Sequence, residues 1–544
     1  MGNWISVLRK PDFVTGATEA TPLRFEEKAA YSCPVQFDYL VGEHSAKVVV
    51  YPSGSPVKYL KLRFEGDLTF IDKVYGDQWE RSSPGAYLEW RSVMSSRVLP
   101  WFCYVRGNDQ TACYGVKTGA DCFAFWQVDT HGITLFLNLC CGNDGTDLQE
   151  PIVACEVVQL FGAEGEDTYK TARAFSQMMC EQPVLPVTPI YGVNNWYWAY
   201  GDISREIVLK ETDYLMQMTA GCKNPPYMVI DAGWQRDFVL QNYAYLGGPW
   251  TANSRFGDMG KMAEEIHKRG AKAGLWERPL LTHDPMPEEA RAASAFGGDI
   301  LDPTHPFAME KIYNDTATIR SWGYDLIKHD FSANDLTGLS PITSDKQDYL
   351  MFAPDRRLFD RTKTSAAVFK NLYRTIQNAA NGAEVIGCNV FGHLSAGIHS
   401  AQRTGGDTSG RAYEWTKRCG VNTVMRLPTN NLFYNVDPDC AAFTDQVPAD
   451  INLDFLEMCA CTGMVTLASV TPGCLSDAEM QRINEIYRIA DANEMALGIA
   501  NYDKIAEPEI FVSEDGSIEK RFDWTKPYHG SRIVLKWSET KEDD

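Results

Sequence analysis

The sequence predicts a multidomain α/β and β protein. We expect an N-terminal β-sandwich over residues 1–185, a central (β/α)8 TIM barrel over 186–495 and a short C-terminal β region over 496–544. Three observations lead to this prediction. The 544 residues exceed what one hydrophobic core usually holds. Short β-type segments dominate before residue 185, and from residue 190 onward apolar strands alternate with amphipathic helices.

The N-terminal part contains β-type segments separated by Gly, Pro, Asn and Asp. Strands are predicted over 46–51, 58–64, 122–128, 133–139 and 153–161. Successive strands with few helical stretches between them indicate a sandwich. Pro183 and Pro186 then favour extended chain over 181–186, which we interpret as a linker.

The central part contains eight strand candidates, the number that closes a barrel. They cover 191–198, 227–231, 271–276, 325–330, 384–388, 399–404, 421–426 and 464–468. Helices are predicted over 205–218, 260–269, 306–322, 362–380, 410–419, 453–461 and 476–490. Thr304 or His305 could open the third helix, and Ser476 with Glu479 forms a capping-box pattern at the last. The tail suggests strands over 509–512, 517–522 and 532–536, too short for a core of their own.

The charge of the chain limits its partners. A net charge of −21 repels phosphate backbones and anionic lipid surfaces, so neither nucleic acid nor membrane is expected as a partner. No apolar run reaches the roughly 18 residues of a membrane span. A small neutral substrate fits this charge better than an anionic partner does. The sequence is also compatible with a homo-oligomer.

The cysteines indicate the compartment. Fifteen of them are scattered without a C-x-x-C pair or zinc-finger spacing. Together with the lack of a leader at Met1, this predicts a reduced, cytoplasmic protein. The first six residues match the short myristoylation pattern, but no basic cluster follows them. Dinucleotide, phosphate-loop and zinc-protease motifs are absent from the sequence, so neither a cofactor nor a metal is expected.

Tryptophans and charged residues gather where the predicted barrel strands end, the usual place of a barrel's chemistry. The substrate-binding candidates are Trp196, Trp198, Asp231, Trp234, Trp276, Lys328, Cys388 and Arg403. Indole rings can cover the C–H face of a sugar, and charged groups can bind its hydroxyls. For any single tryptophan, core packing is an equally good interpretation.

Two aspartates are the catalytic candidates. Asp330 ends a short apolar strand, and Lys328, two positions earlier, points to the same side of it. Asp407 lies in a glycine-containing turn after the sixth strand candidate. Glycoside cleavage needs two such carboxyl groups, one to attack or activate water and one to protonate the leaving oxygen. Each aspartate could instead cap the helix that follows it.

Four motifs carry a resemblance to a known family. They are IDAGW (230–234), GLW (274–276), IKHD (327–330) and RTGGD (403–407). In order and approximate spacing they resemble the α-galactosidase-like enzymes of glycoside hydrolase family 36, clan D. The resemblance implies a retaining mechanism, with Asp330 as nucleophile and Asp407 as acid/base. It further implies that Asp231, Lys328 and a loop at 388–392 contact the sugar. The segment 437–440 also resembles part of the family, without a firm role.

The sequence departs from the family pattern in three places. Ala232 stands where typical members carry a second adjacent aspartate, so one of two carboxylates expected near the C4 and C6 hydroxyls is missing. The sugar could then be an α-galactosaminide or an arabinopyranoside as well as a plain α-galactoside. Glu277 and Arg278 follow the third strand and could face the pocket or the solvent. A counterpart to the arginine that many members place before the fourth-strand motif is not clear.

Three other interpretations compete with hydrolysis. One is transfer of the sugar to an acceptor, as in the raffinose synthases built on the same scaffold. Another is a non-catalytic, degenerate barrel that only binds carbohydrate, which Ala232 favours. The third is a metal-dependent barrel enzyme, for which only His329, His393 and His399 lie near strand ends. His329 should point away from the pocket, because it lies between Lys328 and Asp330.

Overall fold

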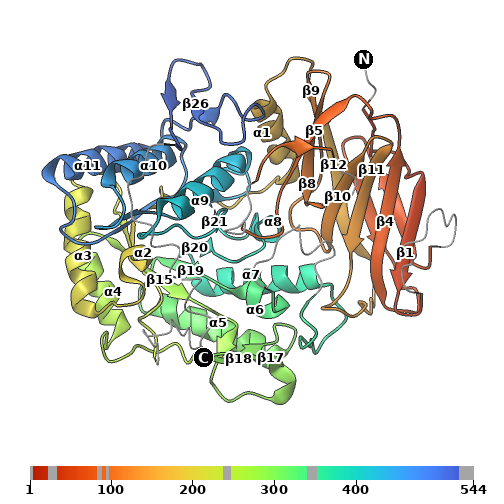
Figure 1. The fold of residues 1–544 in the computed structure, drawn as a ribbon. Coiled ribbons are helices and arrows are strands. Elements are labelled where there is room, and N and C mark those ends of the chain that lie inside the picture. Colours follow the sequence, from red (N-terminus) through yellow and green to blue (C-terminus); the bar gives the residue numbers. More distant parts are fainter. Residues whose placement is uncertain are drawn as a thin grey trace, which may run out of the picture.

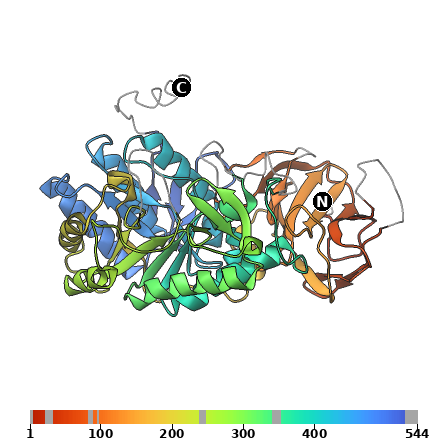
Figure 2. The same cartoon turned by 90° about the horizontal axis from the view of Figure 1, so that it is seen from below.

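The computed structural model describes residues 4–21, 33–81, 88–93, 97–236, 247–339 and 352–525. Figure 1 shows an antiparallel β part, coloured red to orange, beside a barrel coloured yellow to blue. Figure 2 shows the same two parts side by side from a second direction. The predicted strand over 532–536 and the start of the myristoylation pattern lie outside the described residues.

The N-terminal part is built from two antiparallel sheets. The first has the order β1-β4-β11-β10-β7, with β1 Phe13–Thr18, β4 Val57–Glu65, β11 Gly132–Asn138, β10 Phe123–Asp129 and β7 Leu99–Pro100. The second has the order β2-β3-β12-β9-β8-β5-β6, with β2 Phe37–Val41, β3 Ala46–Val50, β12 Ile152–Phe161, β9 Gln110–Val116, β8 Phe102–Gly107, β5 Ile71–Gly76 and β6 Arg91–Ser92. The five strands predicted here are confirmed as β3, β4, β10, β11 and β12.

Side-chain alternation explains why these segments form a sandwich. In β4, Leu60, Leu62 and Phe64 are fully buried, whereas Lys61 and Arg63 between them are partly exposed. Period-two alternation of this kind buries one face of a strand in the core. The sequence did not predict helix α1 Thr168–Met179, which begins at the N-cap Asp167 and packs on β9 and β12.

The barrel sheet has the order β22-β21-β20-β19-β15-β14-β13-β24-β23, and all of its neighbouring strands are parallel. Its strands are β13 Tyr191–Asn194, β14 Tyr227–Ile230, β15 Lys272–Glu277, β19 Leu326–His329, β20 Glu384–Gly387, β21 Ala401–Arg403, β22 Asn435–Asp437, β23 Cys440–Phe443 and β24 Thr466–Val470. The two end strands of this order, β22 and β23, are separated in the chain only by Pro438 and Asp439. They are therefore two halves of one broken seventh strand, and the sheet closes through it.

The predicted strand over 421–426 is wrong. These residues fall almost entirely in helix α9 Tyr413–Met425, which also replaces the helix expected over 410–419. Val421, Val424 and Met425 are fully buried. The C-terminal half of α9, from Cys419 to Met425, is buried on all sides. A short stretch of this kind has no exposed face, so its pattern cannot be told from that of a buried strand. The true seventh strand, formed by β22 and β23, contains the segment 437–440.

The first barrel strand is shorter than predicted, because β13 ends at Asn194 and helix α2 Trp196–Ala199 follows. A small sheet of β16 Leu281–Thr282, β17 Arg291–Ala295 and β18 Gly298–Leu301 was not predicted. It is inserted between β15 and the next barrel helix.

Seven helices flank the strands as expected: α3 Arg205–Met218, α4 Met259–Lys268, α5 Pro306–Ser321, α7 Ser365–Ala380, α9, α10 Ala449–Cys461 and α11 Asp477–Ala492. His305 caps α5, and the capping box of Ser476 with Glu479 opens α11. After the barrel comes a sheet of β25 Gly498–Ile499, β26 Ile510–Val512 and β27 Glu519–Arg521. Within the part of the chain that is described, no helix is long and apolar enough to cross a membrane.

Candidate active site

Asp330 follows β19 directly and is almost fully buried. Its Oδ2 accepts a hydrogen bond from Trp276 Nε1 at 3.0 Å, and its Oδ1 accepts from Asn389 Nδ2 at 2.6 Å and from the amide of Phe331 at 2.7 Å. Each carboxylate oxygen therefore has a donor, and these hydrogen bonds fix the orientation of the carboxyl group. Three strand ends, those of β15, β19 and β20, together position this one side chain.

The turn after Asp330 is held in an unusual conformation. Phe331 has a φ of 65°, a left-handed value that costs energy for a residue with a bulky side chain. The Arg278 guanidinium lies 4.3 Å from the centre of the Phe331 ring and pairs with both carboxylate oxygens of Asp335, at 2.9 and 2.5 Å. Through these contacts, Arg278 stabilises the conformation of this turn. Glu277, its neighbour in the chain, is fully buried and contacts Thr316 of α5.

Lys328 and Asp231 form a buried ion pair, with Lys328 Nζ 2.6 Å from Asp231 Oδ2. Asn194, at the end of β13, donates to the same oxygen at 2.7 Å, and the amide of Ala232 donates to Oδ1 at 2.8 Å. Burial lowers the pKa of Lys328, but the charge of Asp231 outweighs it and holds this pKa well above its ordinary value. A lysine held in its charged form therefore lies beside the Asp231 carboxylate in the barrel mouth.

Asp407 lies in the loop after β21, with a side chain that is 53% exposed. Its Oδ1 is 2.5 Å from Arg81 Nη1 and 3.3 Å from Arg403 Nη2. Desolvation raises the pKa of Asp407, but the charge of Arg81 and then that of Arg403 more than offset it, so the pKa lies well below its ordinary value. Arg403 itself is buried and pairs with Asp439 at 2.9 Å.

Cys388 and Asn389 follow β20. The Cys388 thiol lies 3.5 Å from Arg403 Nη1, and burial raises the pKa of this thiol well above its ordinary value, so it stays neutral. Asn389 is the more informative residue, because it donates to Asp330 and accepts from Arg81 Nε at 2.7 Å.

The predicted tryptophans have different environments. Trp276 and Trp234 are fully buried, and Trp234 Nε1 donates to the carbonyl of Trp276 at 3.0 Å. Trp198 Nε1 donates to Glu211 of α3 at 2.9 Å, while Trp196 packs edge-on against Tyr200. In this structure Trp276 orients Asp330, and the indole N–H of Trp198 is directed at the helix layer. Stacking on a sugar stays a prediction for these four residues.

The structure brings the two catalytic candidates into one network. Asp330, Asn389, Arg81 and Asp407 are joined by consecutive hydrogen bonds. Lys328, on the same strand as Asp330, pairs with Asp231, which follows β14. His329 points the other way, toward His399 at 3.3 Å and the ring of Tyr373 on α7. The alternation expected along β19 is therefore present.

Two contact residues, Arg81 and Asn194, were not predicted from the sequence, and Asn389 was predicted only as part of the loop 388–392. Asn194 could have been found from the position at which β13 ends, had the strand been given its true length. Asn389 follows the predicted Cys388 in the same loop. Arg81 carries no local signal, because it comes from the segment after β5 in the N-terminal part.

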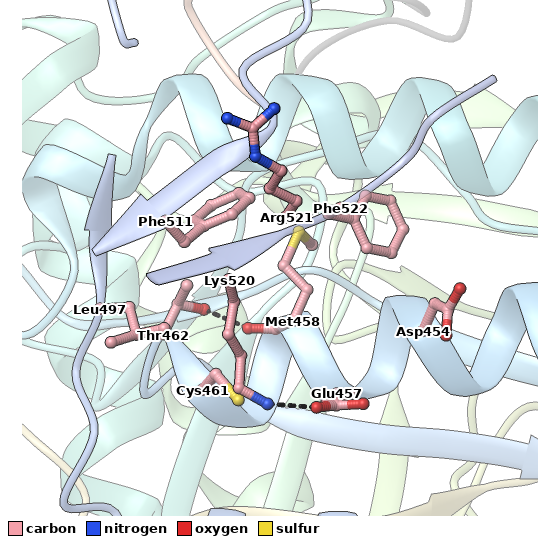
Figure 3. A pocket seen from close by; sticks show the side chains of 10 residues that line it. All are labelled: Asp454, Glu457, Met458, Cys461, Thr462, Leu497, Phe511, Lys520, Arg521 and Phe522. Atoms are coloured by element: carbon pink, nitrogen blue, oxygen red, sulfur yellow. Dashed lines mark hydrogen bonds and ion pairs between the residues drawn. The ribbon is translucent and has the colours of Figure 1, made fainter. Parts of the chain in front are cut away.

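Two cavities lie elsewhere. One of about 210 Å³ opens between α10 and the C-terminal sheet, where Lys520 pairs with Glu457 (Figure 3). Another of about 310 Å³ is lined by residues 185–190 and by Asn435, at the start of β22. The first lies outside the ring of strands and the second at the end of the barrel opposite to Asp330.

Comparison with solved structures identifies the architecture. The chain is similar to TtGalA, an α-galactosidase from Thermus thermophilus, with a TM-score of 0.58 and 17% identity over 90% of this chain and 99% of that one. It is also similar to the GH36 α-galactosidase AgaA from Geobacillus stearothermophilus (TM-score 0.58, 13% identity, 92% and 81% covered). An α-galactosidase from Lactobacillus brevis gives a TM-score of 0.56 at 14% identity, with 87% and 67% covered.

By sequence, neither a protein-family model nor a curated protein matches the chain. The structural likeness nevertheless spans nearly the whole chain and includes the β-sandwich as well as the barrel. The predicted fold class is confirmed, and the chain has the fold of the GH36 α-galactosidases.

Proposed function

We propose that this protein is a retaining α-glycosidase that hydrolyses terminal α-galactosides or a closely related sugar, such as an α-galactosaminide or an arabinopyranoside. The observation that carries the proposal is the buried carboxylate of Asp330, held by Trp276 and Asn389 at the C-terminal end of a barrel strand. The barrel has the fold of α-galactosidases, among them one solved with p-nitrophenyl α-D-galactopyranoside.

The reaction proceeds in two displacements. An Asp330 oxygen attacks the anomeric carbon while the bond to the leaving oxygen breaks, and Asp407 gives its proton to that oxygen. The product of this step is a glycosyl ester on Asp330. In the second step Asp407 takes a proton from water, the water oxygen attacks the anomeric carbon and the ester bond breaks. The sugar leaves with its original anomeric configuration.

The charges of the site favour a neutral sugar. Lys328 is matched by Asp231, Arg403 by Asp439 and Arg81 by Asp407. Each cation therefore already has a carboxylate partner, and an anionic substrate would gain little. The Lys328–Asp231 pair offers donors and acceptors to adjacent hydroxyls, which is how charged groups select a sugar. The identity of the sugar depends on Ala232, which leaves one acceptor fewer than two adjacent aspartates would supply.

The test compares the wild type with Asp330→Ala on an aryl α-galactoside. Turnover should fall by about 10³-fold or more, because the nucleophile is lost. Asp325→Asn is the matched control, because Asp325 lies just before the other end of β19 and pairs with His267 at 2.8 Å. Its turnover should stay close to that of the wild type.

The anomer that forms first, followed by NMR, tests the mechanism. The α-anomer is expected, and initial release of the β-anomer would contradict a retaining mechanism. Product formed only when a sugar acceptor is added would indicate a transferase on the same scaffold. Sugar binding without turnover in the wild type would indicate a degenerate, carbohydrate-binding barrel. The cytoplasmic location stays a prediction from the cysteines.

A further inference from the structure

A segment of the N-terminal part reaches the barrel mouth. It comprises residues 77–81, which directly follow β5, and we call it the arm. Arg426, after α9, binds the arm at two points and also binds Thr404, which follows β21. Its Nε lies 2.6 Å from Asp77 Oδ1, its Nη2 donates to the carbonyl of Glu80 at 2.7 Å, and its Nη1 donates to the carbonyl of Thr404 at 2.6 Å. The same arginine therefore fastens the arm and the start of the loop that carries Asp407.

The arm places Arg81 between the two carboxylates of the proposed reaction. Arg81 Nη1 contacts Asp407 at 2.5 Å, and Arg81 Nε donates to Asn389 Oδ1 at 2.7 Å. The other end of the Asn389 amide donates to Asp330 at 2.6 Å. One guanidinium thus touches the proton-donor candidate directly and orients the amide that holds the nucleophile candidate. Its side chain is only 15% exposed, so water competes weakly for these bonds.

We propose that Arg81 is a positioning residue, which keeps Asp407 ionised in the resting enzyme and fixes the Asn389 amide against Asp330. This inference rests on the proposed glycosidase function, because it assigns Arg81 its role through the two catalytic candidates.

The groups that face Asp407 support this assignment. Cations approach it from three elements, namely Arg81 of the arm, Arg403 of β21 and Lys328 of β19, and Tyr197 of α2 also faces it. Asp439, which also lies here, binds Arg403 at 2.9 Å and so offsets that charge.

Glu80 lies 3.3 Å from Arg81, but burial raises the pKa of Glu80 to about 8. At neutral pH Glu80 is therefore mostly uncharged, and the charge of Arg81 acts chiefly on Asp407.

Arg81 therefore stabilises the deprotonated form of Asp407, the proposed acid/base residue. Protonation of Asp407 weakens its contact with Arg81, so Arg81 keeps the pKa of Asp407 low. The first displacement needs the proton of Asp407, so its rate falls as the pH rises. Removal of the Arg81 charge should raise the pKa of Asp407 and move the basic limb of the pH profile upward. An opposite charge at this distance usually lowers a carboxyl pKa by about one to three units, so a shift of that size is expected.

The experiment measures kcat/KM against pH for the wild type, Arg81→Gln and Arg81→Lys on an α-galactoside with a poor leaving group. In Arg81→Gln the midpoint of the basic limb should move to a higher pH, by about one to three pH units. Arg81→Lys keeps the charge, so the limb should stay in place, while kcat falls because a lysine cannot contact Asn389 and Asp407 in the same fork geometry.

Arg173→Gln is the matched control, because Arg173 also joins the N-terminal part to the barrel, through the carbonyl of Asn430 at 2.9 Å. Its pH profile should equal that of the wild type. An unmoved basic limb in Arg81→Gln, with an active wild type, overturns the inference and leaves the proposed function standing.

A second measurement needs no activity and decides the inference if the wild type cleaves no α-galactoside. The free energy of unfolding is measured against pH for the wild type, Arg81→Gln, Asp407→Asn and the double variant. Above about pH 4, the Asp407→Asn change should lower the free energy of unfolding more in the protein with Arg81 than in the Arg81→Gln variant. This difference between the two backgrounds should become smaller as the pH falls. Equal costs in both backgrounds across the pH range overturn the inference.

Discussion

Trp276 and Asp330 come from neighbouring barrel strands and meet through one hydrogen bond, in which the indole Nε1 donates to Oδ2 at 3.0 Å. Trp276 is fully buried, so this donor has no competition from bulk water. The indole predicted to stack on a sugar therefore has a second role, because it fixes the oxygen of the proposed nucleophile that Asn389 does not hold.

Trp276→Phe should test this role. The ring volume is largely kept, but Asp330 loses one donor, and a hydrogen bond to a charged group contributes about 1.5–3 kcal/mol. We expect kcat to fall about 10- to 100-fold, because the Asp330 carboxylate is then held less firmly in the position from which it attacks.

Trp250→Phe is the control for this prediction. Trp250 packs edge-on against Trp276 with ring centres 5.9 Å apart, and its Nε1 has no acceptor among the described residues. The same loss of an N–H in Trp250→Phe should leave kcat close to that of the wild type. An equal fall of kcat in both variants would indicate a general packing effect in place of a specific bond to Asp330.

Asp407→Ala should separate the acid role of this residue from a structural one. Substrates with poor leaving groups need a proton on the departing oxygen, and activated aryl glycosides do not. The rate of the first step should therefore fall by about 10²-fold or more on the former and much less on the latter. The measurement is kcat/KM across a series of α-galactosides with aglycones of graded pKa. Equal losses across the series would contradict the proton-donor role.

Local sequence was enough to predict the site residues at the barrel strand ends, but not the site residue that the N-terminal part supplies. Asp231, Lys328 and Asp330 were predicted because each lies at the end of a short apolar strand, and parallel strands bring such ends together. Arg81 could not be predicted this way. It contacts Asp407, 326 residues later in the chain, and only the packing of the N-terminal β part on the barrel brings the two together.

The seventh strand shows a second limit. Pro438 and Asp439 interrupt it, and each half has only three or four residues, so no run long enough to indicate a strand exists. The buried C-terminal half of α9, from Cys419 to Met425, is longer, and its pattern predicts a strand there instead. Periodicity identifies elements with one polar face, and it fails where burial is complete.

Glu277→Gln should change how stability depends on pH. Burial raises the pKa of Glu277 to about 8, and among the described residues its two oxygens accept only from Thr316 Oγ1, at 3.2 and 3.0 Å. The folded state therefore holds this proton more tightly than the unfolded chain. The resulting stability is full below the unfolded pKa of about 4.3 and is lost as the pH rises through 8.

A glutamine is neutral at every pH, so Glu277→Gln should gain stability relative to the wild type between pH 5 and pH 8.5, by about 1 kcal/mol or more. Thermal unfolding at the two pH values measures the gain. Glu264→Gln, at an exposed glutamate of α4 that pairs with Lys268, should show a nearly constant offset. A constant offset for Glu277→Gln as well would mean that Glu277 is ionised in the folded protein.

Ala232→Asp should restore the second carboxylate of the usual pair and move the preference of the enzyme toward plain α-galactosides. Ala232 is buried, and its amide already donates to Asp231, so the new carboxylate would lie beside an existing one. We expect a loss of about 1–3 kcal/mol in the free energy of unfolding, because a second anion is buried without a new cation.

The measurement is the ratio of kcat/KM for an aryl α-galactoside to that for the matching α-galactosaminide and arabinopyranoside. A site that gains an acceptor for a hydroxyl should favour the sugar that carries it by about tenfold or more. Ala232→Asn, with similar volume and no charge, shows how much of the change a neutral acceptor can supply. If the ratio stays that of the wild type in both variants, Ala232 does not determine the sugar, and the specificity resides in the residues around Lys328 and Asp231.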